Sequence, residues 1–172
     1  MPIVVPDNLA NRIEKELRIF NERVELELLR RLQYIGEHAV NEARQNHAYK
    51  DQTGNLTSSI GYAIFKDGEL WYISKFNQKY NSKKKKSIEG TLEGENYARS
   101  LASQYPTGIT LVVVAGMNYA AHVERKGIGG MTGAELRAKT EVEKLLVSLT
   151  KNAYRKEQQL SRRYEHYANQ IK

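Results

Sequence analysis

Two long amphipathic segments at opposite ends of the chain constrain its fold more than any other feature. In residues 7–49 apolar side chains recur every three or four positions, and the same spacing returns in residues 134–172. That period draws one apolar stripe along a helix. A helix over residues 7–49 would reach about 60 Å, which is longer than a compact domain of this size is wide. Part of the helix must therefore project or meet another subunit, and Gly36 is the cheapest place for a kink or break.

The residues between these helices carry strand and turn signals. Residues 51–76 predict a polar turn followed by a hairpin, because large and small side chains alternate from Ile60 to Ile64, as in a half-buried strand. Asp67-Gly68 follows, and this pair suits the positive φ angles of a tight hairpin turn. The return strand is expected over residues 70–76.

The next two segments predict an inserted loop and a further strand. Residues 77–107 are rich in Asn, Ser, Lys, Gly and Glu, so we expect an inserted mobile loop with a short helix over residues 95–104. Residues 109–127 hold a β-branched strand, residues 109–115, and a Tyr-Ala-x-x-Val-Glu element. Such a strand is typical of the centre of a sheet that is covered on both faces. A glycine-rich hinge, residues 127–133, precedes the last helix.

These elements predict a single α+β domain over residues 1–172, with a small antiparallel sheet flanked by long amino-terminal and carboxyl-terminal helices. The chain has no cysteine, which excludes disulfide scaffolds, thiol nucleophiles and Cys-ligated metal centres. No apolar run approaches the roughly 20 residues of a membrane span. The first residues resemble no signal peptide, because charged helix follows them directly. We therefore expect a protein of the cytoplasm, without contact to a membrane.

Motifs for catalysis or metal binding are not visible in the sequence. The four histidines are scattered without a recognised metal-ligand spacing. No Gly-Lys-Ser/Thr phosphate loop and no Gly-x-Ser-x-Gly nucleophile frame is present. Paired carboxylates, such as Glu141 with Glu143, are two positions apart in a helix and face different ways. The sequence predicts neither an enzyme nor a cofactor or metal site.

The charge raises an alternative function. The net charge is +7, and clustered Lys and Arg bind phosphate by releasing counterions. The excess is spread along the chain, however, and a short Lys run in a polar setting is typical of a solvated loop. Tyr164 and Tyr167 continue the apolar stripe of the last helix, so packing explains them more simply than base stacking. The alternative is non-specific nucleic-acid binding through Lys83, Lys84, Lys85, Lys86, Arg155, Arg162 and Arg163.

Two short stretches resemble motifs of one protein family. Asp51-Gln52-Thr53-Gly54-Asn55-Leu56-Thr57-Ser58-Ser59-Ile60 resembles the Asp/x-Thr-Gly-x-Leu-x-x-Ser-Ile element of phage tail-completion or neck proteins. These are minor tail components of long-tailed double-stranded-DNA phages, encoded among the head-tail joining genes. Residues 119–127, Tyr-Ala-Ala-His-Val-Glu-Arg-Lys-Gly, are similar to that family's Tyr-Ala-x-x-Val-Glu-x-Gly element. The matched positions are Asp51, Thr53, Gly54, Leu56, Ser59, Ile60, Tyr119, Ala120, Val123, Glu124 and Gly127.

The resemblance implies a structural protein of a phage or prophage at the head-tail junction. Such a protein would assemble with itself as a ring, complete the tail or neck and contact connector and tail-tube proteins. It would be found in the cytoplasm of the bacterial host and then in the virion. This chain differs from the family in its Lys-rich insertion, its glycine-rich hinge and its long last helix. From the residues alone, both motifs are expected to specify the fold more than to form a site.

Overall fold

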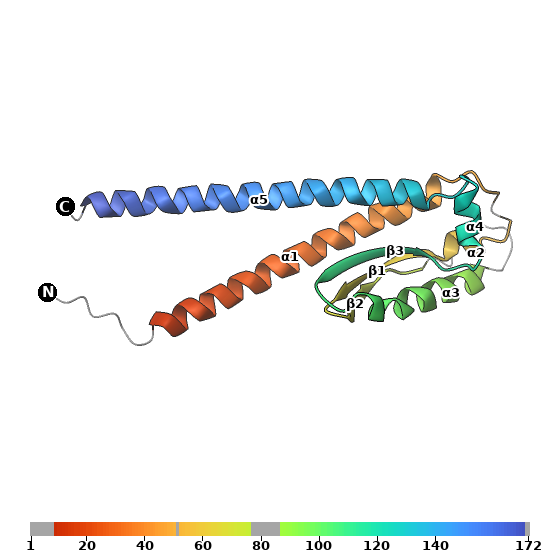
Figure 1. Ribbon diagram of the computed structural model, residues 1–172, viewed down its shortest axis with the longest axis horizontal. Coiled ribbons are helices and arrows are strands. Elements are labelled where there is room, and N and C mark those ends of the chain that lie inside the picture. The colour runs from red at the N-terminus through yellow and green to blue at the C-terminus, as the bar shows by residue number, and fades with distance from the viewer. Residues whose placement is uncertain (1–8, 51, 77–86, 171–172) are drawn as a thin grey trace.

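The computed structural model of the protein describes residues 9–50, 52–76 and 87–170. The predicted α+β arrangement of a small antiparallel sheet with long helices is confirmed. Figure 1 shows α1 and α5 lying together beside the sheet and diverging toward their other ends. The elements in chain order are α1 (Leu9–Gln45), α2 (Asn55–Ser58), β1 (Ile60–Lys66), β2 (Glu69–Ile73), α3 (Ser87–Ser100), the 3-10 turn η1 (Ala102–Gln104), β3 (Ile109–Ala115), α4 (Ala120–Arg125) and α5 (Met131–Gln170).

The sheet has the strand order β2-β1-β3, with both pairs antiparallel. The hairpin turn is confirmed, because Asp67 and Gly68 have φ angles of 51° and 83°, as a primed turn requires. β2 ends at Ile73, three residues before the predicted end, and the Ser74 hydroxyl then accepts a hydrogen bond from the Tyr62 N–H at 2.9 Å. β3 has the predicted bounds, but its predicted central place is wrong. The hairpin occupies only one side of β1, so β3 pairs on the other side and lies at an edge.

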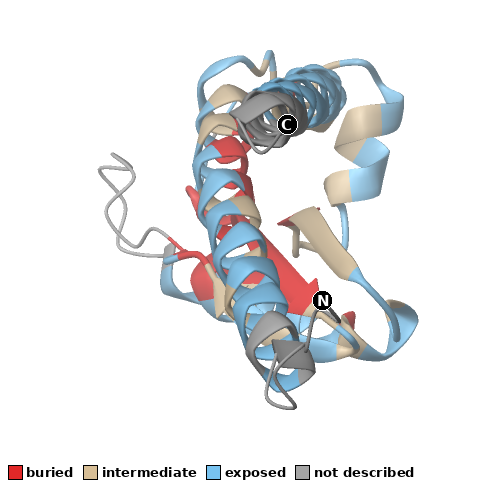
Figure 2. Ribbon diagram, turned by 90° about the vertical axis from the view of Figure 1, so that its left-hand side faces the viewer, coloured by how far each residue is buried: buried red, intermediate tan, exposed pale blue. Residues whose placement is uncertain are grey.

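Two hydrophobic cores lie on opposite faces of the sheet. Ile60, Tyr62 and Ile64 of β1 pack against α1 and α5, whereas Ala63 and Phe65 pack against α3 and the residues around η1. Successive strand residues point to opposite faces, so one strand supplies both cores. Figure 2 shows the buried residues concentrated in β1 and in the part of α1 that crosses it.

α1 is one continuous helix through Gly36, so no break occurs at the place where it would be cheapest. Gly36 is buried against the ring of Tyr62, and a Cβ atom there would lie 2.5 Å from the Tyr62 Cδ2. The Tyr62 side chain is fully buried, and its hydroxyl donates to Glu37 Oε1 at 3.0 Å. The glycine therefore allows α1 to approach the sheet closely.

The predicted mobile loop of residues 77–107 is wrong for its second half. Residues 77–86 lie outside the described residues, but α3 already begins at Ser87, so the helix is longer than the predicted one over residues 95–104. Glycine disfavours helices, which explains the prediction. Tertiary packing overrides that preference, because the glycines of α3 face the chain beneath it and Ala98 and Leu101 enter the core.

The ends of the long helices also differ from the predictions. α1 ends at Gln45 rather than at residue 49, because the N–H groups of Ala48 and Tyr49 both donate to the Ile128 carbonyl, at 2.9 and 3.1 Å. α5 begins at Met131 rather than at residue 134. The glycine-rich hinge is thus shortened to the residues before Met131.

The parts of α1 and α5 farthest from the sheet carry exposed apolar side chains. Leu17 and Val24 of α1 are 57% and 44% exposed, and Leu146 and Tyr154 of α5 are 53% and 62% exposed. These residues lie on the parts of the helices that project beyond the two cores. The length of the predicted helix led us to expect such a projection. Within the described residues, no helix has both the length and the apolar character needed to cross a membrane.

Candidate assembly surface

The first family-like motif forms a buried turn of helix between α1 and β1. Gly54 precedes α2 with a φ angle of 80°, a left-handed conformation that costs glycine little. The Thr53 hydroxyl accepts a hydrogen bond from the Asn55 N–H at 3.3 Å. Leu56 is buried, and the Ser59 hydroxyl donates to the Leu56 carbonyl at 2.7 Å. Asp51 lies outside the described residues, and Ile60 is in the core.

Two glycines bring α3 onto this motif. A Cβ atom at Gly90 would collide with the backbone carbonyl of Asn55, and one at Gly94 would lie 2.5 Å from the Ser59 carbonyl oxygen. The Asn55 amide also donates to Glu89 Oε2 at 2.8 Å. The motif is therefore held between α3 and the sheet, as a fold-specifying element would be.

The second family-like motif caps α5. Tyr119 and Ala120 begin α4, and Gly127 follows it with a φ angle of 69°. The carboxylate of Glu124 accepts hydrogen bonds from the N–H groups of Met131 and Thr132, at 3.2 and 2.8 Å, and from the Thr132 hydroxyl. The first N–H groups of a helix have no partner within it, so this side chain satisfies two of them. Burial opposes the charge of Glu124, but the hydrogen bonds from Thr132 and Met131 outweigh it and lower the pKa of Glu124.

Replacing Glu124 with alanine is expected to reduce the free energy of unfolding by about 1 kcal/mol at pH 7, since the helix cap is lost. Because the folded-state pKa is lowered, the ionised carboxylate stabilises the folded state above its ordinary pKa of 4.5. This contribution is lost as the pH falls through the folded-state pKa. Urea unfolding of both proteins at pH 7 and pH 3 measures it.

The matched control is Glu135→Ala, which removes an exposed carboxylate from the first turns of the same helix. Glu135 pairs with Lys139 on the surface, and such pairs contribute only a few tenths of a kcal/mol. A Glu124→Ala deficit that is equally large at pH 3 would contradict the capping role.

The two motifs meet across a small cavity of about 270 Å³. Thr53 and Leu56 of the first motif line it from one side, and Tyr119 and Val123 of the second from the other. Tyr119 is 40% exposed. The structure thus brings together two motifs that lie about 60 residues apart in the sequence. The remaining lining residues are Tyr49, Lys50 and Gln52.

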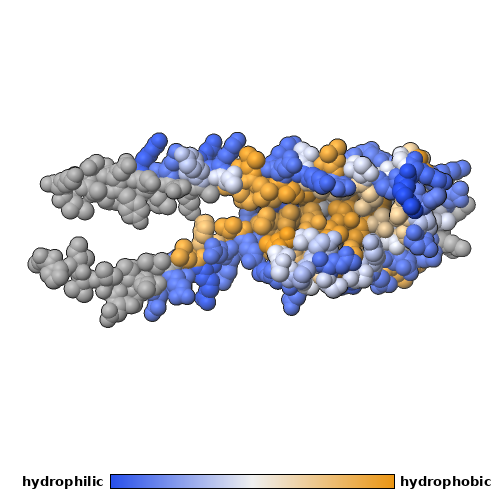
Figure 3. Space-filling view, in the orientation of Figure 1, coloured by the Kyte–Doolittle hydropathy of each residue, from blue (hydrophilic) through white to orange (hydrophobic). Residues whose placement is uncertain are grey.

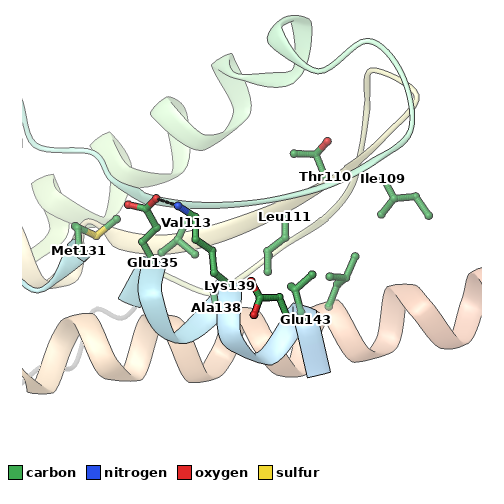
Figure 4. A pocket seen from close by; sticks show the side chains of 11 residues that line it. Ile109, Thr110, Leu111, Val113, Met131, Glu135, Ala138, Lys139 and Glu143 are labelled. Atoms are coloured by element: carbon green, nitrogen blue, oxygen red, sulfur yellow. Dashed lines mark hydrogen bonds and ion pairs between the residues drawn. The ribbon is translucent and has the colours of Figure 1, made fainter. Parts of the chain in front are cut away.

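A larger apolar groove lies between β3 and α5, with a volume of about 590 Å³. Figure 3 shows apolar residues gathered there on the face toward the viewer, and in Figure 4 Leu111 and Val113 point from β3 toward α5. Lys139 donates to Glu135 at 2.6 Å along the polar rim. The residues of this groove are Leu32, Ile109, Thr110, Leu111, Val113, Met131, Glu135, Ala138, Lys139, Val142 and Glu143.

The backbone of β3 is open beside this groove. The Asp67 N–H donates to the Gly108 carbonyl at 2.9 Å, and the Gly116 N–H donates to the Ser59 carbonyl at 3.1 Å. The register between these bonds is unbroken, and bonded pairs alternate in antiparallel strands. The even-numbered residues of β3 therefore bond to β1. The N–H and C=O groups of Ile109, Leu111, Val113 and Ala115 point away from it, where no described strand pairs with them.

The structure does not bring the predicted basic residues to either motif. Arg155 and Arg162 are exposed on the part of α5 that extends beyond the sheet. Lys83, Lys84, Lys85 and Lys86 lie outside the described residues, as does the Arg163 side chain. The two described members, Arg155 and Arg162, are about two turns apart on α5.

Ionisable groups gather instead where α1 crosses α5. Arg137 contacts Glu42 at 2.9 Å and Glu141 at 3.1 Å, and His38 lies 3.4 Å from Glu141. Hydrogen bonds from Asn46 and Arg137 lower the pKa of Glu42. The Arg137–Glu42 and His38–Glu141 contacts join the two helices, whereas Arg137–Glu141 lies within α5. Among the described residues, no group of three or more His, Asp and Glu side chains could hold a metal ion.

Comparison with known proteins gives no match. No protein-family model, no curated protein and no solved structure is similar to this chain at a significant level. The groove and the open edge were not anticipated from the sequence. Residues 109–115 carry no charge, which is consistent with an apolar groove and an edge that another chain covers. The same composition also fits a central strand.

Proposed function

We propose that the protein is a structural component of a phage or prophage at the head-tail junction, where it assembles as a ring that completes the tail or neck. The observation that carries this proposal is the open edge of β3 beside an apolar groove. A strand edge of this kind pairs readily with another chain. The resemblance of residues 51–60 and 119–127 to the tail-completion family supports the choice of assembly.

The mechanism is association rather than catalysis. Leu17, Val24, Leu146 and Tyr154 expose apolar area on the diverging helices, and burying such area favours association. A ring requires two different surfaces on each subunit. Leu17 of α1 and Tyr154 of α5 lie about three to four helical turns beyond the groove residues Leu32 and Glu143 of the same helices, so each subunit offers two places for a head-to-tail contact.

Sedimentation of the full chain over a concentration series tests the assembly. Binding to phage connector and tail-tube proteins, taken from any such genes that neighbour its own, tests the place of assembly. We expect oligomers at micromolar concentration and binding to at least one of those proteins. Leu111→Asp, which places a charge in the groove, is expected to abolish both. Glu69→Asp at the opposite edge of the sheet is the control. A chain that stays monomeric and binds neither protein would contradict the proposal.

Non-specific nucleic-acid binding is the second candidate, because Lys151, Arg155 and Arg162 are exposed on α5. Binding of a DNA duplex of about 30 base pairs across a salt series distinguishes the two. If phosphate contacts carry the function, affinity falls by orders of magnitude between 50 and 200 mM salt. For a purely structural protein we expect no binding at the higher salt concentration. Tight binding that Arg155→Ala and Arg162→Ala weaken would favour the second candidate.

A further inference from the structure

We propose that residues 3–5 of one copy pair as a short antiparallel strand with the open edge of β3 in a neighbouring copy. Ile3 and Val5 would then fill the apolar groove between β3 and α5. This inference rests on the self-assembly in the proposed function and names the contact that joins two copies. Residues 1–8 lie outside the described residues, so the argument starts from the edge they would cover.

The two edges of the sheet differ in how they are protected. β3 has no charged residue and no proline from Ile109 to Ala115, and its register with β1 is unbroken. β2 begins with Glu69, and its pairing with β1 shifts register between Ile64 and Phe65 of β1. Charges and irregularities are the ordinary protection of an exposed edge. The edge of β3 lacks both, which indicates that it is covered in the assembled protein.

The sequence of residues 2–6, Pro-Ile-Val-Val-Pro, fits this edge. In a strand, the backbone groups of alternate residues point to opposite sides. If Ile3 and Val5 turn their N–H and C=O groups to β3, then Pro2, Val4 and Pro6 turn theirs away. Proline has no N–H and is tolerated where that side faces solvent. Both prolines thus lie on the solvent side of the new strand, where no N–H donor is needed for pairing with β3. There they also prevent a further strand from adding.

The side chains of Ile3 and Val5 also fit the proposed pairing with β3. Residues that oppose each other in an antiparallel pair have side chains on the same face of the sheet. The β3 residues with outward backbone groups, among them Leu111 and Val113, are those whose side chains face α1, α5 and the groove. Ile3 and Val5 opposite them would enter the groove. Their β-branched side chains suit a strand, and their burial would cover its apolar floor.

The strand must come from another copy, because the distance within one chain is too great. Leu32 is the groove residue of α1. It lies 23 residues after Leu9, the first described residue of the helix. The distance from Leu9 to Leu32 along the helix axis is therefore about 35 Å. The six residues from Leu9 back to Ile3 span at most about 20 Å when extended. In Figure 1 the start of α1 lies far from the sheet. Residues 3–5 therefore reach a neighbour's groove and not their own.

Disulfide trapping between two differently labelled full chains tests this contact, and the absence of native cysteine makes it specific. Val4 shares a face with Val112 in the proposed pair, so Val4→Cys in one chain and Val112→Cys in the other should give a mixed dimer under mild oxidation. Glu69→Cys, at the opposite edge of the sheet, is the control partner and should give none. A chain carrying both Val4→Cys and Val112→Cys should form bonds between copies and none within a monomer.

Two outcomes overturn the proposal. Val112→Cys alone forming a dimer as readily as the mixture would show that β3 pairs with its own copy. Equal trapping by Glu69→Cys, or none with either partner, would show that residues 3–5 do not occupy this edge.

A second variant does not depend on cysteine chemistry. Ile3→Asp should weaken self-association by about tenfold or more, because it removes a buried apolar side chain, and it should leave the unfolding transition of the monomer unchanged. Asn8→Asp adds the same charge outside the proposed strand and should have no comparable effect. If the Ile3→Asp protein assembles normally and still binds connector or tail-tube proteins, the strand exchange is wrong and the proposed function stands. A chain that is monomeric throughout contradicts both.

Discussion

Replacing Phe65 with alanine is expected to reduce the free energy of unfolding by about 3–5 kcal/mol. Phe65 is fully buried in the core between the sheet and α3, and its ring stacks on Tyr105 at a centroid distance of 5.8 Å. The substitution removes the transfer free energy of the ring and leaves a cavity. For a chain of this length the loss corresponds to a fall in Tm of roughly 10 °C. Urea and thermal unfolding, followed by far-UV circular dichroism, measure it.

Trp71→Ala in the same hairpin is the matched control. Trp71 is 38% exposed on β2, so its replacement should cost about 1–2 kcal/mol, clearly less than that of the fully buried Phe65. Comparable losses for the two variants would mean that the core beneath α3 is not formed as described. Both proteins must be compared at one concentration, because self-association adds to apparent stability.

Replacing Gly36 with alanine is expected to cost about 1–3 kcal/mol, although alanine favours helices over glycine. The added Cβ atom would lie 2.5 Å from the Tyr62 ring, and that ring is fully buried. α1 and the sheet would have to separate, or Tyr62 would have to leave its rotamer. Urea unfolding of the variant measures the cost.

Gly133→Ala in α5 gives the opposite sign and controls for helix propensity. A Cβ atom there would meet nothing closer than 3.8 Å, so we expect the variant to stabilise the protein by about 0.5–1 kcal/mol. If Gly36→Ala is also stabilising, the close approach of α1 to Tyr62 is refuted.

Periodicity and turn chemistry were sufficient to predict most of the fold. The apolar stripes located both long helices, and Asp67-Gly68 located the hairpin, because these signals are local. Burial by distant residues was not predictable in the same way. Gly36 indicates a weak point in the helix until Tyr62 is placed against it. The glycines of α3 indicate a loop until the Asn55 and Ser59 carbonyls are placed beneath Gly90 and Gly94.

The candidate site was predictable only in part. Both motifs were singled out from the sequence, but their meeting across one cavity depends on the path of the chain between them. From the sequence, Glu124 lies just before the predicted glycine-rich hinge of residues 127–133. Its role as a helix cap depends on Gly127 turning the chain so that Thr132 returns to it, and a spacing of eight residues is not a recognised capping pattern. The edge position of β3 could not be read from its composition, which suits a central strand equally well.

The cap formed by Glu124 has a mechanical consequence. α5 is 40 residues long, or about 60 Å, and its first turn is held by a side chain from the motif that lines the cavity with Tyr119 and Val123. A tilt of about 5° at that end would displace the far end by about 5 Å. A small rotation at the cavity wall is therefore amplified along the helix. Any change in the geometry of the cavity wall would be largest at the far surface of α5, about 60 Å away.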